Sequence, residues 1–536
     1  MAGIRGASFH KPSGKYQALI TIDGKRKHLG YYNTEEDAGA AYKAAKAKVT
    51  APKPKAAAPT VKQPKDTHID PKSTGFKFDN AGFIFKFTKD DITVVSNDGK
   101  EKISATKAAN CFMKHYHLLA VKESSKDEKI WIYDEYQGIY VPHGTRLICY
   151  MLEELGGDLC SPKLENNVIN IIRNHVSFSI EQFDPDAHML CVRNGVIDLR
   201  SGKFMDHSYK YMMSAILNVE YRPGVKCLIF DKFLEDVLEH ELDKDTIYDF
   251  MAATLIKKPF DVFISLTGTG SNGKGRLIHF IRWFIGVENV TTTRITNLGK
   301  RFQSTWLFKK WLILNGELEG DFPIGSVKDV TSGNPMQGEI KNGGVFEFIP
   351  FVKAMFDTNN PPIIHDDSDG RKRRHINLNF IKKFVDNPTR LNDRKIDRDI
   401  LDKLETEEQK SGVLNELIPR AIELLNGRGI YRRKSEQETA DEYDMQTHSD
   451  SSFIDGWCEF DQDFDKFTYS SELYEAYKRF CATINVPPKS QKALGAYLNK
   501  LGYRATHEGE KRLMAYRGIQ LKPLIRIGAD GEKAIA

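Results

Sequence analysis

The sequence predicts a multidomain protein of the mixed α/β class, on three observations. Its 536 residues correspond to roughly three to five domains of about 100–200 residues each. Over residues 261–380, short apolar runs alternate with helical patterns, as in an α/β sheet with buried strands. Residues 49–73 are rich in Ala, Pro and Lys and form a linker, because this composition cannot pack a core. We therefore divide the chain into residues 1–48, 49–73, 74–260, 261–435 and 436–536.

The composition excludes several classes of protein. Hydrophobic residues make up 40% of the chain and charged residues 28%, which is close to ordinary globular usage and excludes wholesale disorder. No run of about 18 apolar residues exists, so we expect no membrane-spanning helix. Residues 1–10 lack the apolar core of a secretion signal. The seven cysteines are scattered and form no C-x-x-C pair, which favours a reducing compartment over a disulfide framework or a zinc site.

The N-terminal segment is predicted to be a small basic domain. Residues 16–22 are strand-like, Asp23-Gly24 is typical of a hairpin turn, and residues 26–32 form the return strand. Thr34 can cap a helix that runs to about residue 48, with acids in its first turn. Residues 1–72 contain 14 Lys and Arg against 6 Asp and Glu, whereas acids slightly outnumber bases in the remainder. This excess suits contact with phosphate groups, although a solubilising tail would also explain it.

The region before the core is predicted to mix strands and helices. Its expected elements are a hairpin over 127–141, helices at 148–155 and 167–176, a strand–turn–strand unit over 192–199, and amphipathic helices at 230–238 and 245–256.

The clearest motif is a glycine-rich loop between a strand at 261–267 and a helix that ends near residue 285. The loop and its flank consist of Gly268, Gly270, Ser271, Asn272, Gly273, Lys274, Gly275 and Arg276, with Thr at 269. Strand, glycine loop and helix form the context of a phosphate-binding loop, whose backbone N–H groups converge on phosphate oxygens. Lys274 would reach the β- and γ-phosphates of ATP. Gly275 stands where a hydroxyl would bind Mg²⁺, and a glycine-rich turn without a ligand is the alternative.

Two acids follow the second apolar run, residues 311–314. Glu317 is the first candidate and Glu319 the second for holding Mg²⁺ through water and polarising an attacking water. Solvated loop acids are the alternative for both residues.

Polar and basic residues follow the third apolar run, residues 352–356. Asn359 would hydrogen-bond the γ-phosphate or the attacking water, although Asn-Pro pairs also form ordinary turns. Arg373 and Arg374 belong to a basic cluster, and an arginine supplied across a subunit boundary can stabilise a transferring phosphoryl group. A surface basic cluster is the alternative.

Together these segments resemble superfamily 3 helicases, the AAA+-related hexameric ATPases of viruses and plasmids. Lys274 and Glu317 are 43 residues apart, and Glu317 and Asn359 are 42 apart, which is the compact spacing of that family. Residues 331–344 look like its additional motif, whose hairpin grips DNA in the ring channel, with Lys341 as the gripping residue. Residues 194–199 and 271–274 are similar to elements of phage and plasmid primase–helicases, which are related to the poxvirus enzyme.

The resemblance implies an AAA+-like P-loop ATPase core over residues 261–435, preceded by a helicase N-terminal region. It implies that subunits form a hexameric ring, that ATP and Mg²⁺ bind between neighbouring subunits, and that the ring moves on single-stranded DNA. No primase domain is recognisable, so a separate primase or polymerase would be a partner. The expected compartment is the cytoplasm, or the host cytoplasm for a virus. Two alternatives stay open: a replication initiator whose nucleotide-binding module does not hydrolyse ATP, and a translocase on duplex DNA.

The two ends of the chain resemble DNA-binding modules. Residues 3–48 are similar to Apetala-type domains, in which a three-stranded sheet enters the major groove; the matching positions imply DNA contacts by Arg5, Lys15, Tyr16 and Arg26. At the other end, a helix capped by Ser470 or Ser471, a helix over 491–501 and a hairpin over 502–518 follow the order of a winged helix.

Overall fold

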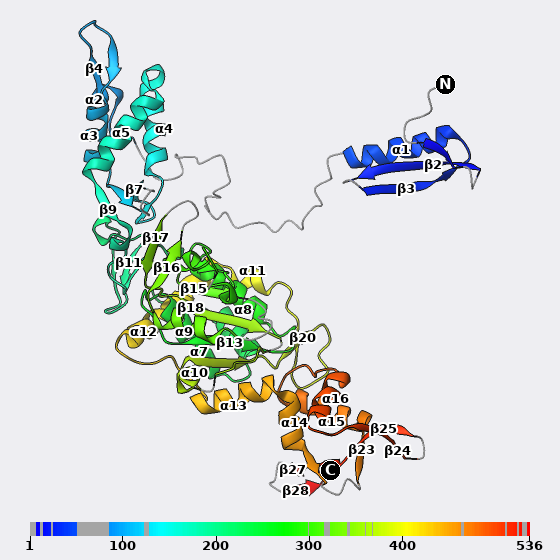
Figure 1. Cartoon of the computed structure of the whole chain (residues 1–536). Coiled ribbons are helices and arrows are strands. Elements are labelled where there is room, and N and C mark those ends of the chain that lie inside the picture. Colours follow the sequence, from blue (N-terminus) through cyan, green and yellow to red (C-terminus); the bar gives the residue numbers. More distant parts are fainter. Residues whose placement is uncertain are drawn as a thin grey trace. The chain divides into compact units, whose positions relative to one another are not determined.

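The structure is a computed structural model, and it consists of two compact units, Met1–Phe76 and Lys77–Ala536 (Figure 1). It describes residues 7–10, 14–22, 25–50, 85–122, 128–298, 300–315, 322–339, 344–359, 361–366, 368–461, 466–509, 512–522, 525–527 and 533–535. The mixed α/β multidomain class is confirmed. No helix within these ranges is long and apolar enough to span a membrane.

The N-terminal unit is a three-stranded antiparallel sheet with one helix packed on it. The sheet order is β1 (Ala7–His10), β2 (Lys15–Ile22) and β3 (Lys25–Tyr32), followed by α1 (Glu35–Thr50). The expected cap is present, because the backbone N–H of Asp37 donates to Thr34 Oγ1 at 3.2 Å. Ala18 of β2 and Ala38 of α1 are fully buried, so small side chains let the helix lie close to the sheet.

The second unit begins with a region of small sheets and helices. Its elements are α2 (Lys89–Ile92), β4 (Thr93–Val95), β5 (Glu101–Ile103), α3 (Ala105–His115), β6 (Leu118–Lys122), β7 (Glu128–Asp134), β8 (Ile139–Val141), α4 (Gly144–Gly156), α5 (Pro162–His175), β9 (Ser177–Ser179), β10 (Met189–Val192), β11 (Gly195–Asp198), β12 (Lys203–Met205), α6 (Leu228–Val237) and α7 (Asp243–Thr254). The strands form a sheet of order β8-β7-β6-β9 and another of order β10-β11-β12. The hairpin expected over 127–141 and the strand–turn–strand unit over 192–199 are therefore confirmed.

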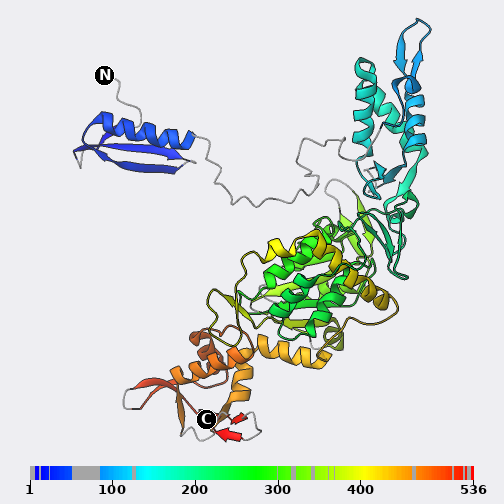
Figure 2. The ribbon, with the colours of Figure 1, turned by 180° about the vertical axis from the view of Figure 1, so that it is seen from behind.

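A five-stranded parallel sheet forms the centre of the second unit (Figure 1, Figure 2). Its order is β14 (Val290–Thr291), β15 (Leu312–Asn315), β18 (Lys353–Thr358), β13 (Phe263–Thr267) and β19 (His375–Asn379). The three apolar runs of the sequence thus become the adjacent strands β15, β18 and β13. Between and after them come α8 (Lys274–Ile285), α9 (Ile324–Ser332), the hairpin β16 (Met336–Glu339) and β17 (Val345–Phe348), α10 (Asp369–Arg374), β20 (Lys383–Val385), β21 (Asp393–Lys395), α11 (Ile400–Leu404) and α12 (Glu407–Leu425).

Helices cover both faces of this sheet, because alternate residues of each strand point to opposite sides. On one face Ile264 and Met355 pack with Phe280 of α8 and with side chains of α6, α7 and α12. On the other face Phe263 and Phe356 pack with α9 and with the next helix, α13 (Glu436–Thr447). The strands are therefore buried on both sides, which explains their continuous apolar sequences.

The C-terminal part contains α14 (Ser449–Trp457), β22 (Cys458–Phe460), β23 (Phe467–Tyr469), α15 (Ser470–Thr483), α16 (Gln491–Lys500), β24 (Ala505–Glu508), β25 (Leu513–Arg517), β26 (Ile519–Leu521), β27 (Ile525–Ile527) and β28 (Lys533–Ile535). The expected helices and hairpin are present, but the expected cap is wrong. Tyr469 is the N-cap of α15, and neither Ser470 nor Ser471 caps it. The reason is that β23 leads directly into the helix, so Ser470 is already helical and its hydroxyl accepts from Gln491 Nε2 at 3.1 Å.

Candidate nucleotide site

The glycine loop, residues 268–275, links the end of β13 to the start of α8. Gly270, Ser271 and Gly273 have φ angles of 96°, 50° and 89°, in the left-handed region that glycine adopts at little cost. Gly268 has no room for a side chain, since a Cβ there would lie 2.2 Å from Asn272 Nδ2 and 2.5 Å from the carbonyl oxygen of Phe380. The shape of the loop therefore requires glycine at positions 268, 270 and 273.

Gly275 differs from the other glycines of the loop. It lies in the first turn of α8, and nothing is within 4 Å of a Cβ placed on it. A hydroxyl-bearing residue would fit there sterically, so packing does not explain the glycine.

Lys274 is 4% exposed and lies at the base of the loop. Its ammonium donates to the carbonyl oxygen of Gly268 at 2.8 Å, to Asn272 Oδ1 at 3.1 Å and to Asn359 Oδ1 at 3.2 Å. Asn359 directly follows β18, and Thr358 is the register partner of Thr267 at the end of β13. The structure thus brings together Lys274 and Asn359, because parallel neighbouring strands end at the same edge of the sheet.

The predicted acids lie outside the described residues. Glu317 and Glu319 follow β15, which is separated from β13 by β18. Asn315 is the last residue of β15, and its Oδ1 accepts a hydrogen bond from the backbone N–H of Ile295 at 3.0 Å. The strand that precedes the acids therefore ends at the same edge of the sheet as β13 and β18. No cluster of three or more His, Cys, Asp or Glu side chains with metal-site geometry occurs among the described residues.

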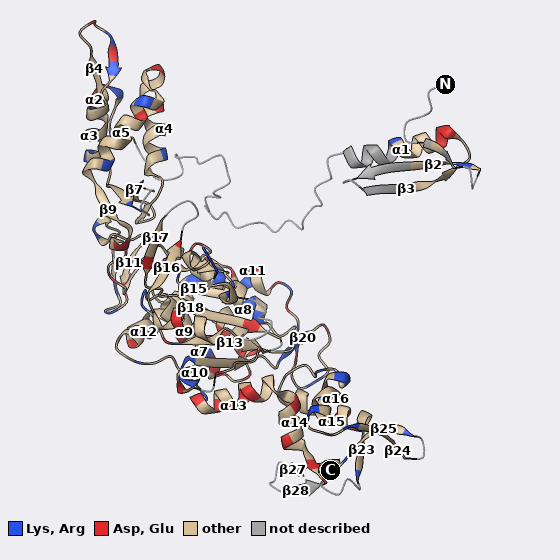
Figure 3. Ribbon diagram, in the orientation of Figure 1, with Lys and Arg blue, Asp and Glu red and all other residues tan. Residues whose placement is uncertain are grey.

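Arg373 and Arg374 lie at the amino-terminal ends of the sheet strands, opposite to the ends that carry the glycine loop and Asn359. Arg373 Nη2 and Arg374 Nε contact the carboxylate of Asp261 at 2.7 and 2.5 Å, just before β13 begins. Burial acts to raise the pKa of Asp261, but hydrogen bonds from Ser332 and Arg374 outweigh it and hold the pKa below its ordinary value. At about 3.3 Å per strand residue, β13 separates this pair from the glycine loop by about 15–20 Å. The arginines therefore do not reach the loop of their own chain; Figure 3 shows the basic end of α10 on which they lie.

The predicted DNA contacts are only partly described. On β2, Lys15 is exposed, whereas Tyr16 is half-buried on the face that carries the buried Ala18. Arg26 lies on β3, where its backbone register partner is Thr21 of β2, toward the opposite end of these strands from Lys15. The side chain of Arg26 is not among those that the structure describes. Arg5 and Lys341 also lie outside the described residues.

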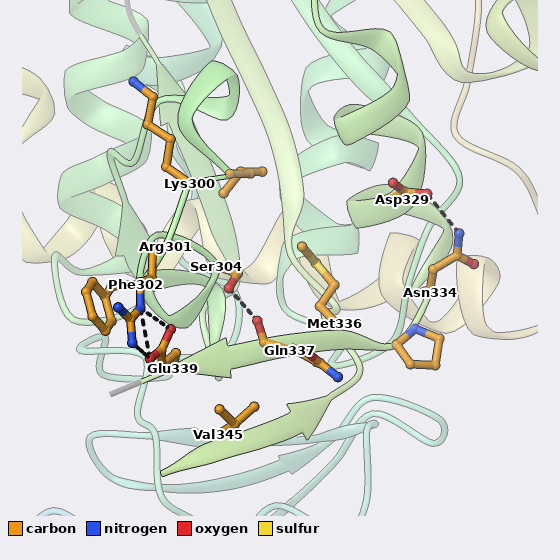
Figure 4. Close-up of a pocket in the computed structure, with 12 residues that line it drawn as sticks. Lys300, Arg301, Phe302, Ser304, Asp329, Asn334, Met336, Gln337, Glu339 and Val345 are labelled. Atoms are coloured by element: carbon orange, nitrogen blue, oxygen red, sulfur yellow. Dashed lines mark hydrogen bonds and ion pairs between the residues drawn. The ribbon is translucent and has the colours of Figure 1, made fainter. Parts of the chain in front are cut away.

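The hairpin β16–β17 flanks the segment that contains Lys341, and the end of β16 that precedes this segment is held by side chains of residues 301–305. Arg301 contacts both carboxylate oxygens of Glu339, at 2.5 to 3.0 Å, and the hydroxyl of Thr305 donates to the carbonyl oxygen of Glu339 at 3.0 Å. A pocket of about 490 Å³ lies beside β16, lined among others by Lys300, Phe302 and Val345 (Figure 4). This pocket is separate from the glycine loop and belongs to the hairpin.

The glycine loop also makes contacts that the sequence did not predict. The backbone N–H of Phe384 in β20 donates to the carbonyl oxygen of Ser271 at 2.8 Å, and Val237 of α6 packs against Gly273. Asn272 Nδ2 donates to the carbonyl oxygen of Phe380 at 3.1 Å. Because two of these contacts use backbone groups, which every residue has, no sequence pattern could have identified them.

Comparisons with known proteins show that two segments of the chain are similar to protein families. Residues 109–239 match the family described as D5 N terminal like, and residues 266–374 match a family of unknown function, DUF5906. The first of these families comprises N-terminal regions of phage and viral primase–helicases.

Solved structures of the NrS-1 C-terminal region also resemble the chain. Two A-form apo structures are each 11% identical in sequence and cover 76% of this chain. For the first, 97% of its own chain is covered and the TM-score is 0.39; for the second, these values are 96% and 0.37. A further apo structure has 12% identity, covers 77% of this chain and 98% of its own, and has a TM-score of 0.37.

Proposed function

We propose that this protein is an ATP-driven DNA helicase of phage, viral or plasmid replication. The observation that carries the proposal is the position of Lys274, held within hydrogen-bond distance of both the first glycine of the loop and Asn359. An ammonium beside a glycine loop at a helix N-terminus is suited to binding phosphate. The related N-terminal region over residues 109–239 supports a role in replication.

In this proposal the core is an AAA+-like P-loop ATPase. Support comes from the strand order. β18, which precedes Asn359, lies between β13, which precedes the glycine loop, and β15, which precedes Glu317. Lys274 would bind the β- and γ-phosphates, Asn359 would contact the γ-phosphate, and Glu317, with Glu319 beside it, would position Mg²⁺ and water. Bound Mg²⁺ would neutralise charge that develops on the phosphates.

The proposal also includes assembly into a ring, as a hexamer of the superfamily 3 type. Arg373 and Arg374 lie too far from the loop of their own chain, so they would act on ATP bound by a neighbouring subunit. The β16–β17 hairpin, with Lys341 in the segment that joins its strands, would contact single-stranded DNA. The N-terminal unit would bind duplex DNA, and the C-terminal helices and hairpin would form a winged helix.

The first test is ATP hydrolysis by the purified protein with and without single-stranded DNA. We expect single-stranded DNA to stimulate hydrolysis, and Lys274→Met to lower the rate on the order of 100-fold, because the variant lacks the phosphate-binding charge. Lys410→Met is the matched control: Lys410 is also buried, 2% exposed, but lies over the ring of Trp283 in the hydrophobic core. Its loss is expected to reduce stability and leave hydrolysis per folded molecule unchanged.

The alternatives give different results. If the parent binds ATP and duplex DNA without hydrolysing ATP, the replication-initiator function replaces the helicase; the absence of a hydroxyl at Gly275 favours this outcome. If hydrolysis drives movement along duplex DNA without separating its strands, the protein is a duplex translocase.

A further inference from the structure

The turn between α15 and α16 contacts the sheet beside the glycine loop. Asn485 Nδ2, from this turn, donates to the carbonyl oxygen of Phe380 at 3.2 Å. The same oxygen accepts a hydrogen bond from Asn272 Nδ2, in the glycine loop, at 3.1 Å. One carbonyl oxygen therefore links the C-terminal domain, defined here as residues 449–522, to the glycine loop.

A second set of hydrogen bonds joins the same two parts. Gln446 Nε2 donates to the carbonyl oxygen of Ile484 at 3.2 Å and to Asn379 Oδ1 at 2.9 Å. Asn379 Oδ1 also accepts from the hydroxyl of Thr267 at 2.6 Å. Gln446 and Asn379 are 4% and 6% exposed, so water competes little for these bonds. Residues 484 and 485 thus connect to Thr267 before the loop and to Asn272 within it.

The hydrogen bond to the carbonyl oxygen of Phe380 fixes the orientation of the Asn272 side chain. Its Nδ2 points to the carbonyl oxygen of Phe380, so its Oδ1 faces Lys274 and accepts from the ammonium at 3.1 Å. The absence of a side chain at Gly268 leaves the space in which this amide lies. A rotation of Asn272 would therefore remove one of the acceptors that hold Lys274.

The backbone of Asn485 is also unusual for a residue with a side chain. Its φ angle is 55°, in the left-handed region, where Asn is tolerated better than most residues but still at a cost. This conformation directs the amide toward the sheet, so the turn keeps a strained residue at the point of contact.

We propose that Asn485 is a positioning residue for the nucleotide site. Docking of the C-terminal domain, through the carbonyl group of Phe380, sets the orientation of Asn272 and hence the position of the Lys274 ammonium. Nucleotide binding and docking of the C-terminal domain are then coupled, and each favours the other to the same extent. This inference rests on the proposed function for the identity of the ligand, a nucleoside triphosphate.

The test removes the amide of Asn485 without adding backbone strain. Asn485→Gly deletes only the donor, since glycine adopts the left-handed conformation freely. Arg512→Gly is the matched control, because Arg512 has a φ angle of 46° and lies exposed in another turn of the same domain. Hydrogen–deuterium exchange of the backbone amides at 270–275 is measured first, in the absence of nucleotide. We expect faster exchange in Asn485→Gly and no change in Arg512→Gly.

Equilibrium binding of a fluorescent, non-hydrolysable ATP analogue is measured next. We expect Asn485→Gly to weaken binding about fivefold, the usual effect of one lost hydrogen bond. In an Asn272→Ala background, where the link is already broken, Asn485→Gly is expected to have no further effect. Equal loop exchange in Asn485→Gly and parent, or full additivity of the two substitutions, would overturn the proposal.

The two proposals fail in different ways. A parent protein that binds no nucleotide contradicts the proposed function, and the exchange experiment still decides whether Asn485 positions the loop. A parent that binds nucleotide, with Asn485→Gly binding equally well, contradicts only the positioning role.

Discussion

At the scale of single residues, the site depends on pairs that come from distant parts of the sequence. The proximity of Lys274 and Asn359 follows from the sequence, because Asn359 follows one run that predicts a buried strand and Lys274 ends the glycine loop that follows another. The orientation of Asn272 does not follow, because it depends on the backbone carbonyl group of Phe380. Side-chain chemistry is visible in a sequence, whereas the placement of a backbone group depends on the completed fold.

Gly275 allows a direct test at this scale. Gly275→Ala is expected to stabilise the protein by about 0.5–1 kcal/mol, because alanine favours the first turn of α8 and meets no neighbouring atom. Gly275→Ser adds a hydroxyl at the same point and is expected to lower the Mg²⁺ concentration needed for half-maximal hydrolysis. The measurements are thermal unfolding and Mg²⁺ titration of ATP turnover. The same Mg²⁺ dependence in both variants would show that position 275 does not contact the metal.

At the scale of elements, the apolar strands were predictable and β19 was not. Its residues His375, Asn377 and Asn379 share one face, are buried, and make the strand look polar. Ser265 Oγ lies 2.7 Å from His375 Nε2 and donates to Asn377 Oδ1 at 2.7 Å. Asn379 Oδ1 accepts from the hydroxyl of Thr267 at 2.6 Å, whereas His375 Nδ1 has no hydrogen-bond partner among the described residues. Burial holds the pKa of His375 well below its ordinary value, so the ring is neutral at pH 7. Hydrophobic pattern alone cannot identify a strand whose buried face is polar.

A buried charge cluster joins the first region of the second unit to the core. Asp184 contacts Lys257 Nζ at 2.6 Å and Lys309 Nζ at 3.6 Å. Burial acts to raise the pKa of Asp184, but the two lysines outweigh it and hold the pKa below its ordinary value. Burial lowers the pKa of Lys309 to about 8. The cluster links residues that are 73 and about 125 positions apart, so no local pattern predicts it.

We expect Asp184→Asn to lower the free energy of unfolding at pH 7 by about 3 kcal/mol, because two buried ammonium groups lose their counter-charge. Since the folded pKa of Asp184 is depressed, its contribution is present above the unfolded pKa of about 4 and is lost as the pH falls through the folded value. In urea unfolding from pH 7 to pH 3, the difference in free energy between parent and variant should therefore be largest at pH 7 and should narrow as the pH falls below about 4. Asp386→Asn, which removes an exposed ion pair with Arg398, is the control and should cost less than about 1 kcal/mol. A constant difference across the range would contradict this account.

At the scale of the whole molecule, the chain separates a basic N-terminal unit from a larger unit that contains the glycine loop. The composition of residues 49–73 and the charge of residues 1–72 predicted this separation. Residues 75–190 contain no motif from which a function could be predicted.

We expect a chain that lacks residues 1–73 to bind duplex DNA more weakly and with a shallower dependence on salt. The physical reason is that these residues contain most of the excess positive charge, and each phosphate contact adds about one unit to the salt slope. Binding isotherms at several salt concentrations measure this effect. Stimulation of ATP hydrolysis by single-stranded DNA should persist, and its loss would show that the N-terminal unit also acts on the core.

The pair Arg373 and Arg374 shares a single carboxylate, Asp261. The side chain of Arg373 is 60% exposed, whereas that of Arg374 is 13% exposed. In the proposed ring, Arg373 could turn toward a phosphate on a neighbouring subunit while Arg374 still neutralised that carboxylate. The energetic penalty would then resemble that of an exposed ion pair, about 1 kcal/mol or less, rather than the several kcal/mol of an abandoned buried charge. Sharing one acid would therefore make repeated release of Arg373 compatible with a fast cycle.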